Sequence, residues 1–283
     1  MPPIEGTYWR TAPQTDAQRA EVATRSRLID VCALVPRAEL ASIGTVRTVD
    51  NDQTDSCRVE FASPDGTTDK LSWASMVVFT DAPQQAGTTV TQLGAADLSV
   101  LPGDLDRSGT QQTCHATAKF PAGAAIYFQT TTPDGLDACA RLEALAGNAM
   151  RQWMSTPPQG TSPDTKHTVL HGADPCAVRD RLDGATPLGA PTLKACGFNY
   201  RGVDVIVSYE HRERTLLSKN EQTVDGRTVY TVDRSLTAVV GPDQPPGTTG
   251  FGGAIVPVVN VYADNTDVAA EVMRHVLPLF PAA

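Results

Sequence analysis

Six cysteines are the residues of this 283-residue sequence whose chemistry can be examined most directly from their spacing. They are Cys32, Cys57, Cys114, Cys139, Cys176 and Cys196. None belongs to a C-x-x-C pair, and no histidine stands at zinc-ligand spacing from them. The spacing therefore supports neither a zinc site nor a thioredoxin-type redox site. Two alternatives stay open, which are three disulfide bridges or six buried, reduced thiols.

Four of these cysteines occur in phrases that the chain repeats. "LIDVCAL" (28–34) resembles "GADPCAV" (172–178), because in both an acid stands two residues before the cysteine. Each phrase is followed by a second cysteine at the start of a strand-like run, "SCRVEF" (56–61) and "ACGFNY" (195–200). The distance between matching features shortens steadily along the chain, as shorter loops in a second copy would produce. The pattern indicates an internal duplication.

The duplication favours bridges over free thiols. We predict the pairs Cys32–Cys57 and Cys176–Cys196, each joining an N-terminal helix to a strand of its own repeat. A third pair, Cys114–Cys139, would join a strand to the closing helix of the first repeat, and the second repeat has no match for it. Three bridges would place the protein in an oxidising compartment.

Other side chains that could carry chemistry form no convincing group. The histidines are His115, His167, His171, His211 and His275. His167 and His171 are four residues apart and could share a helical face as metal ligands, but a surface position without a third ligand is the simpler interpretation. "GTTGFGGA" (247–254) lacks the lysine of a phosphate-binding loop, and no G-x-S-x-G motif occurs. The acidic residues of "DNDQTD" (50–55) and "PGDLDRSG" (102–109) are expected to lie in solvated loops. We predict no catalytic, cofactor-binding or metal-binding residue.

Composition and charge restrict the class of partner. The net charge is −9, with 41% hydrophobic and 19% charged residues, which suits a folded chain and disfavours nucleic acid as a partner. No apolar run is long enough to span a membrane. The first residues, "MPPIEGTYWRTAPQ", lack the regions of a signal peptide. Either the chain is a complete cytoplasmic protein, or its export segment and anchor have been removed. The expected bridges favour the second interpretation.

The elements that would position these residues form two similar halves. We predict an α+β fold with two tandem domains, each a mostly antiparallel sheet flanked by N- and C-terminal helices and held by disulfides. Residues 1–30 form a tether and a helix, 31–153 the first repeat, 154–166 a proline-rich linker, and 167–283 the second repeat. Helices are expected at 15–30, 35–44, 134–150, 174–182 and 265–280. Strands are expected at 56–61, 72–80, 114–120, 124–132, 195–200, 203–210, 228–241 and 255–263, with a polar connection at 216–226.

The cysteine phrases also carry a resemblance. "DVCAL…AELASIG…CRVEF" resembles actinobacterial, mycobacterial-type cell-envelope lipoproteins that are grouped under a domain of unknown function. Their signature is a D-P-C-A-L opening, an A-E-L-x-x-L-G helix and a second cysteine followed by an aromatic residue. In the second half only "DPCAV" and "CGF" match it. The resemblance implies an exported protein tethered to the membrane, and it assigns no catalytic residue.

These observations lead to a function by binding. We expect a non-enzymatic, extracytoplasmic protein that acts as a sensor, an adaptor or a subunit of an envelope complex, and whose partner is another envelope protein. The alternative is a carrier of a small or lipidic ligand, held in a cavity within or between the domains. A large apolar cavity would favour the carrier, and a tight core with an exposed apolar patch would favour the interaction protein.

Overall fold

A computed structural model describes most of the chain. The described residues are 8–42, 44–51, 53–62, 72–79, 88–105, 111–133, 135–189, 192–217, 220–232, 234–244 and 254–281. Contacts divide the chain into two compact units, Met1–Lys166 and His167–Ala283.

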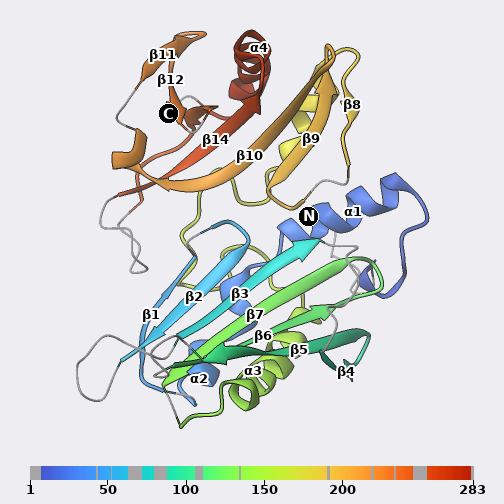
Figure 1. Ribbon diagram of the computed structural model, residues 1–283, viewed down its shortest axis with the longest axis vertical. Helices are drawn as coiled ribbons and strands as arrows, with labels where there is room; N and C mark the ends of the chain where they lie inside the picture. The colour runs from blue at the N-terminus through green and yellow to red at the C-terminus, as the bar shows by residue number, and fades with distance from the viewer. Residues whose placement is uncertain are drawn as a thin grey trace. The chain divides into compact units, whose positions relative to one another are not determined.

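The first unit contains one antiparallel sheet of seven strands. Its strands are β1 (Val46–Asp50), β2 (Ser56–Phe61), β3 (Ser72–Phe79), β4 (Thr89–Leu93), β5 (Ala96–Leu105), β6 (Gln111–Lys119) and β7 (Ala124–Pro133). The helices are η1 (Tyr8–Arg10), α1 (Asp16–Arg27), η2 (Val31–Leu34), α2 (Arg37–Leu40) and α3 (Ala138–Trp153), where η denotes a 3₁₀ helix. The strand order is β1-β2-β3-β7-β6-β5-β4 (Figure 1).

Helix α3 covers the core of this sheet because its apolar residues share one face. Asp137 caps the helix by accepting the backbone N–H of Ala140 at 2.9 Å. Leu142, Leu145 and Ala149 recur at three- and four-residue steps and are buried. They pack against β6 and β7, whose alternate residues are buried in the same core.

The second unit contains a sheet of the same size. Its strands are β8 (Thr186–Pro187), β9 (Ala195–Tyr200), β10 (Val203–Glu213), β11 (Glu221–Val224), β12 (Arg227–Val232), β13 (Ser235–Val239) and β14 (Ile255–Ala263). The helices are η3 (Pro175–Arg181), η4 (Arg214–Leu217), α4 (Thr266–Val276) and η5 (Leu277–Leu279). The strand order is β11-β12-β13-β14-β10-β9-β8 (Figure 1).

The two sheets share one topology. Counted along its own unit, each sheet runs first, second, third, seventh, sixth, fifth, fourth strand, with every neighbouring pair antiparallel. In each unit a helix follows the seventh strand and packs on the sixth and seventh, α3 on β6 and β7, and α4 on β13 and β14. The described residues thus form two separate α+β units with similar sheets.

Three disulfides join helices to these sheets. Cys32–Cys57 joins η2 to β2, Cys176–Cys196 joins η3 to β9, and Cys114–Cys139 joins β6 to α3. These are the three pairs predicted from the sequence, two of them from the repeated phrases. No cysteine is left free among the described residues, which include all six. No helix in the described ranges is long and apolar enough to cross a membrane.

Several elements differ from the sequence prediction. The expected strand at 228–241 is a hairpin of β12 and β13, and Arg234, with φ +68°, lies in its turn. The expected helix at 35–44 is only the four residues of α2, which begins after Pro36. The expected helix at 174–182 is the 3₁₀ helix η3, Pro175–Arg181. Within the expected connection at 216–226 lie part of η4 and all of β11.

Candidate functional site

An open groove beside the C-terminal half of α3 is the most apolar of the described hollows. We call it the α3 groove; its volume is about 530 Å³. It is lined by Arg10, Leu93, Gly94, Ala95, Phe120, Gly147, Met150, Arg151 and Met154. Three separate parts of the chain therefore form it, which are η1, the β4–β5 turn with the end of β6, and α3.

An aromatic cluster fixes the floor of the α3 groove. The ring of Phe120 stacks on Trp153 with a centroid distance of 5.4 Å, and Trp9 lies 6.0 Å from Phe120 and 6.4 Å from Trp153. Both tryptophans are fully buried. The backbone of Trp9 also accepts the N–H of Ala122 at 3.1 Å. Residues 8–10, expected to belong to an irregular tether, are thus anchored, and they hold Arg10 at the groove.

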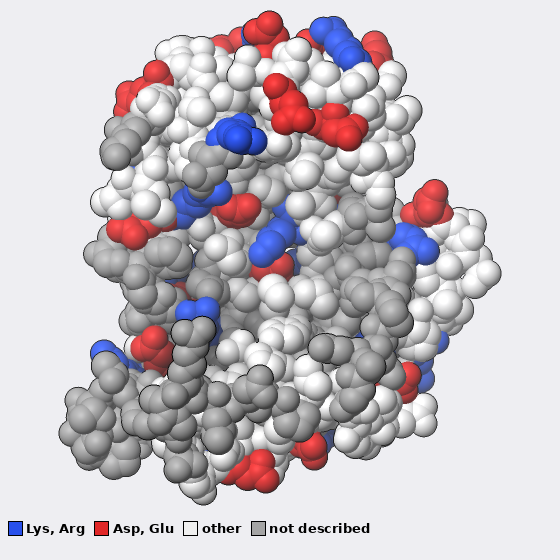
Figure 2. All heavy atoms as spheres, in the orientation of Figure 1, with Lys and Arg blue, Asp and Glu red and all other residues white. Residues whose placement is uncertain are grey.

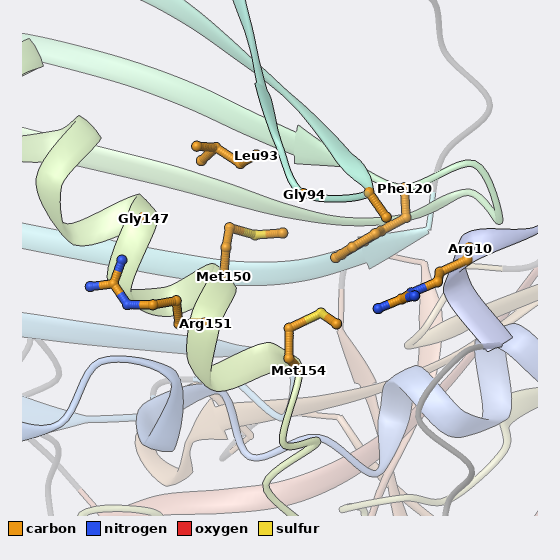
Figure 3. A pocket seen from close by; sticks show the side chains of 9 residues that line it. Arg10, Leu93, Gly94, Phe120, Gly147, Met150, Arg151 and Met154 are labelled. Atoms are coloured by element: carbon orange, nitrogen blue, oxygen red, sulfur yellow. The ribbon is translucent and has the colours of Figure 1, made fainter.

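Two of the lining residues are glycines, which have no side chain to fill the groove. Gly94 has φ +64° in the two-residue turn between β4 and β5, a conformation that glycine adopts at least cost. Gly147 lies inside α3 and has no side chain to cover the groove. Figure 3 shows Phe120, Met150 and Met154 around the gap, with Arg10 reaching toward it and Arg151 directed away.

A second hollow lies beside the Cys32–Cys57 bridge and contains an ion pair. It is lined by residues of η2, α2, the last turn of α3 and the segment after α3. Arg37 and Asp164 form a two-point ion pair there, at 2.8 and 2.6 Å. The hydrogen bond to Asp164 raises the pKa of Arg37. These two charges already pair with each other, and they hold α2 to the segment after α3.

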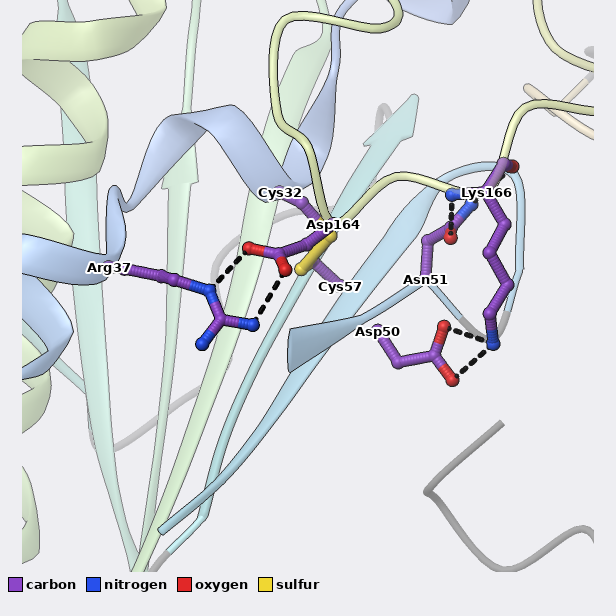
Figure 4. A network of polar contacts seen from close by, with 7 residues as sticks. All are labelled: Cys32, Arg37, Asp50, Asn51, Cys57, Asp164 and Lys166. Carbon is purple, nitrogen blue, oxygen red and sulfur yellow. Dashed lines mark hydrogen bonds and ion pairs between the residues drawn. A yellow bond between two sulfur atoms is a disulfide. The ribbon is translucent and has the colours of Figure 1, made fainter. Parts of the chain in front are cut away.

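The Arg37–Asp164 pair and the contacts of Lys166 attach the proline-rich segment 154–166 to the first unit. The ammonium group of Lys166 lies 2.7 and 2.8 Å from the carboxylate oxygens of Asp50 (Figure 4). The side chain of Asn51 accepts the backbone N–H of Lys166 at 2.7 Å and donates to its carbonyl at 3.2 Å. The segment expected to be a linker between domains therefore packs on the unit that precedes it.

The structure brings together three histidines that the sequence separates. The rings of His167 and His171 are 5.1 Å apart between centroids, and those of His171 and His211 are 5.8 Å apart. The hydroxyl of Thr168 lies 3.2 Å from Nδ1 of His171 and 3.1 Å from Nε2 of His211. These bonds hold residues 167–171 against β10. Neither described hollow is lined by these residues, and no group of three ligating side chains in the described ranges could hold a metal ion.

The two remaining histidines, His115 and His275, line neither of the described hollows. His115 Nδ1 lies 2.5 Å from the hydroxyl of Tyr127 on the face of the first sheet away from α3, and burial raises the pKa of Tyr127. His275 lies in α4. Residues 247–253 of the glycine-rich phrase and 106–109 of the acidic phrase lie outside the described residues. On the face drawn in Figure 2, basic and acidic side chains are interspersed.

Sequence reasoning missed the α3 groove. The signal that could have indicated it is a glycine inside an amphipathic helix, followed by Met150, Arg151 and Met154. No family model matches the chain, and no curated protein or solved structure is similar enough to count as a match.

Proposed function

We propose that the protein is a non-enzymatic binding protein of an extracytoplasmic compartment. It consists of two similar domains, in each of which helices flank the sheet at its N- and C-terminal ends, and it serves as a sensor, adaptor or complex subunit. The three disulfides support this location, because such bridges persist in oxidising compartments. The partner is another envelope protein.

The observation that carries this proposal is the unprotected edge strand β4. Sheet edges in soluble proteins usually carry charges, prolines, bulges or very short strands that prevent pairing with other chains. β1 contains Arg47 and an irregular register, β8 has two residues and ends in Pro187, and β11 is a four-residue strand that begins with Glu221. β4, with the sequence TVTQL, has none of these features.

The backbone of β4 offers hydrogen-bonding groups to a further strand. Leu93 and Ala96 flank the two-residue turn and form a bonded pair, so Val90 and Gln92 direct their N–H and C=O groups away from β5. β4 has no second neighbour in the described sheet, and the Val90 side chain is 48% exposed. An extended segment of a partner protein could pair with this edge, the mode known as β-augmentation.

Affinity purification of the full-length, membrane-attached protein from its own organism tests this proposal. Val90→Lys places a charge on the edge without removing a bond between β4 and β5, so we expect it to abolish co-purification of the partner. Gln222→Lys on β11 is the matched control, because it adds the same charge to an edge that is already protected. Equal recovery of the same partner with both variants would contradict docking on β4.

A second candidate function is a carrier of a small or lipidic ligand. The observation that favours it is the apolar lining of the α3 groove, whose volume falls in the usual range for ligand sites. The groove lies within one unit, and its sides are open to solvent.

A further inference from the structure

We propose that the α3 groove binds a single-chain anionic amphiphile, with the apolar chain along α3 and the anionic group on Arg10. This inference rests on the carrier function and specifies its ligand. It does not depend on the β4 edge.

The lining selects an apolar chain. Leu93, Phe120, Met150 and Met154 provide the side chains that face the groove, and Met154 is 41% exposed. An exposed methionine at a groove can be covered by a ligand, and methionine side chains adapt their shape to different apolar partners. The volume of about 530 Å³ suits one chain better than a lipid with two or more chains.

The charge at the groove selects an anion. The residues that line it include two arginines and no acid. Arg151 donates to Asn148 and points away, whereas the guanidinium of Arg10 makes no hydrogen bond or ion pair with the residues that the structure describes. A guanidinium group pairs with a carboxylate or phosphate through two parallel hydrogen bonds. Arg10 is therefore the group that would fix the head of the ligand.

Gly147 is the one glycine within α3. Glycine inside a helix is less stable than alanine, so its place in α3 needs a reason. The backbone gives none, because Gly147 has no positive φ and a Cβ there would meet only Arg151 Nη1, at 3.8 Å. The absence of a side chain does, however, keep the groove open beside Met150 and Met154.

Calorimetric titration with dodecanoate, below its micelle concentration, tests the assignment. Dodecanoate should bind at one site per chain, and dodecyl phosphate, the second anionic probe, identifies which headgroup is preferred. Dodecanol and dodecyltrimethylammonium should bind about tenfold more weakly or worse, because they cannot pair with Arg10. Equal binding of all four probes, or no binding of the anionic ones, would overturn the proposal.

Two variants locate the site. Arg10→Gln should weaken dodecanoate binding about tenfold and leave dodecanol binding unchanged. Gly147→Leu should abolish binding of both probes by filling the groove. Glu143→Leu is the folding control: it adds the same side chain at an exposed position of α3 outside the lining and should retain dodecanoate binding. Unchanged dodecanoate binding in Arg10→Gln and Gly147→Leu would place the ligand elsewhere and refute the inference, whatever the result for Val90→Lys.

Discussion

Asp30, two residues before the first cysteine, has a larger structural role than its sequence position indicates. Its carboxylate is fully buried and accepts the backbone N–H groups of Cys32 and Ala33 at 3.1 and 3.3 Å. It also accepts three groups from the proline-rich segment, the N–H of Gly160 at 3.1 Å, the N–H of Ser162 at 2.9 Å and the hydroxyl of Thr165 at 2.6 Å. One side chain thus connects η2 to the last residues of the unit.

Replacement of Asp30 by alanine should strongly destabilise the first unit. The substitution leaves several buried donors without an acceptor, so we expect a loss of about 3 kcal/mol in the free energy of unfolding. Asp137→Ala is the control, because it removes a helix cap and should cost about 1 kcal/mol. Guanidinium unfolding followed by tryptophan fluorescence measures both, since Trp9, Trp73 and Trp153 all belong to the first unit. Equal losses would show that the buried network contributes little.

At the residue scale the sequence indicates which cysteines pair but not which polar residues cooperate. The repeated acid before Cys32 and Cys176 is visible in the sequence, and Asp174 does cap the matching turn by accepting the N–H of Cys176 at 2.9 Å. The donors that reach Asp30 from residues 160–165 are more than a hundred positions away. His211 meets His171 and Thr168 only because β10 folds beside them. Contacts between residues so far apart in the chain leave no pattern in the local sequence.

Among the elements, those that pack against a core were predictable. α3, β7 and β14 have periodic or continuous apolar residues, which packing against a core requires. β4 was missed because four of its five residues are exposed, so its sequence shows no alternation. The β12–β13 hairpin was merged into one strand because its turn contains Arg234 and no glycine, proline or asparagine.

The Cys114–Cys139 bridge should stabilise the first unit alone. It closes a loop of 25 residues, for which chain entropy predicts roughly 3.5 kcal/mol. Replacing both cysteines by alanine should therefore shift the tryptophan-detected unfolding of the first unit. Fluorescence of a probe attached to the second unit should be unaffected.

The matched comparison is the Cys176–Cys196 pair. Its double alanine variant should destabilise the second unit by a similar amount, because the loop of 20 residues is nearly as long. A shift of the tryptophan signal in this variant as large as that in the Cys114/Cys139 variant would contradict independent stapling of the units.

For the whole molecule, the duplicated cysteine phrases correctly indicated two similar sheets, since both have the same strand order. The residue at which the first unit ends was harder to predict from the sequence. Prolines and small polar residues at 154–166 are typical of linkers, and composition alone cannot distinguish a free linker from an irregular segment that is held by buried hydrogen bonds.

The boundary can be tested with two fragments. A fragment of residues 1–166 should fold, with Trp9 and Trp153 buried and a cooperative unfolding transition. A fragment of residues 1–153 should be unfolded or far less stable, because it lacks the donors to Asp30, the partner of Arg37 and the bonds of Asn51 to Lys166. Tryptophan emission and circular dichroism distinguish these outcomes. If both fragments fold with the same midpoint, residues 154–166 only connect the units. If 1–166 alone folds, the chain's proline-rich segment completes the first domain, and the second begins at the histidine-bearing residues that follow it.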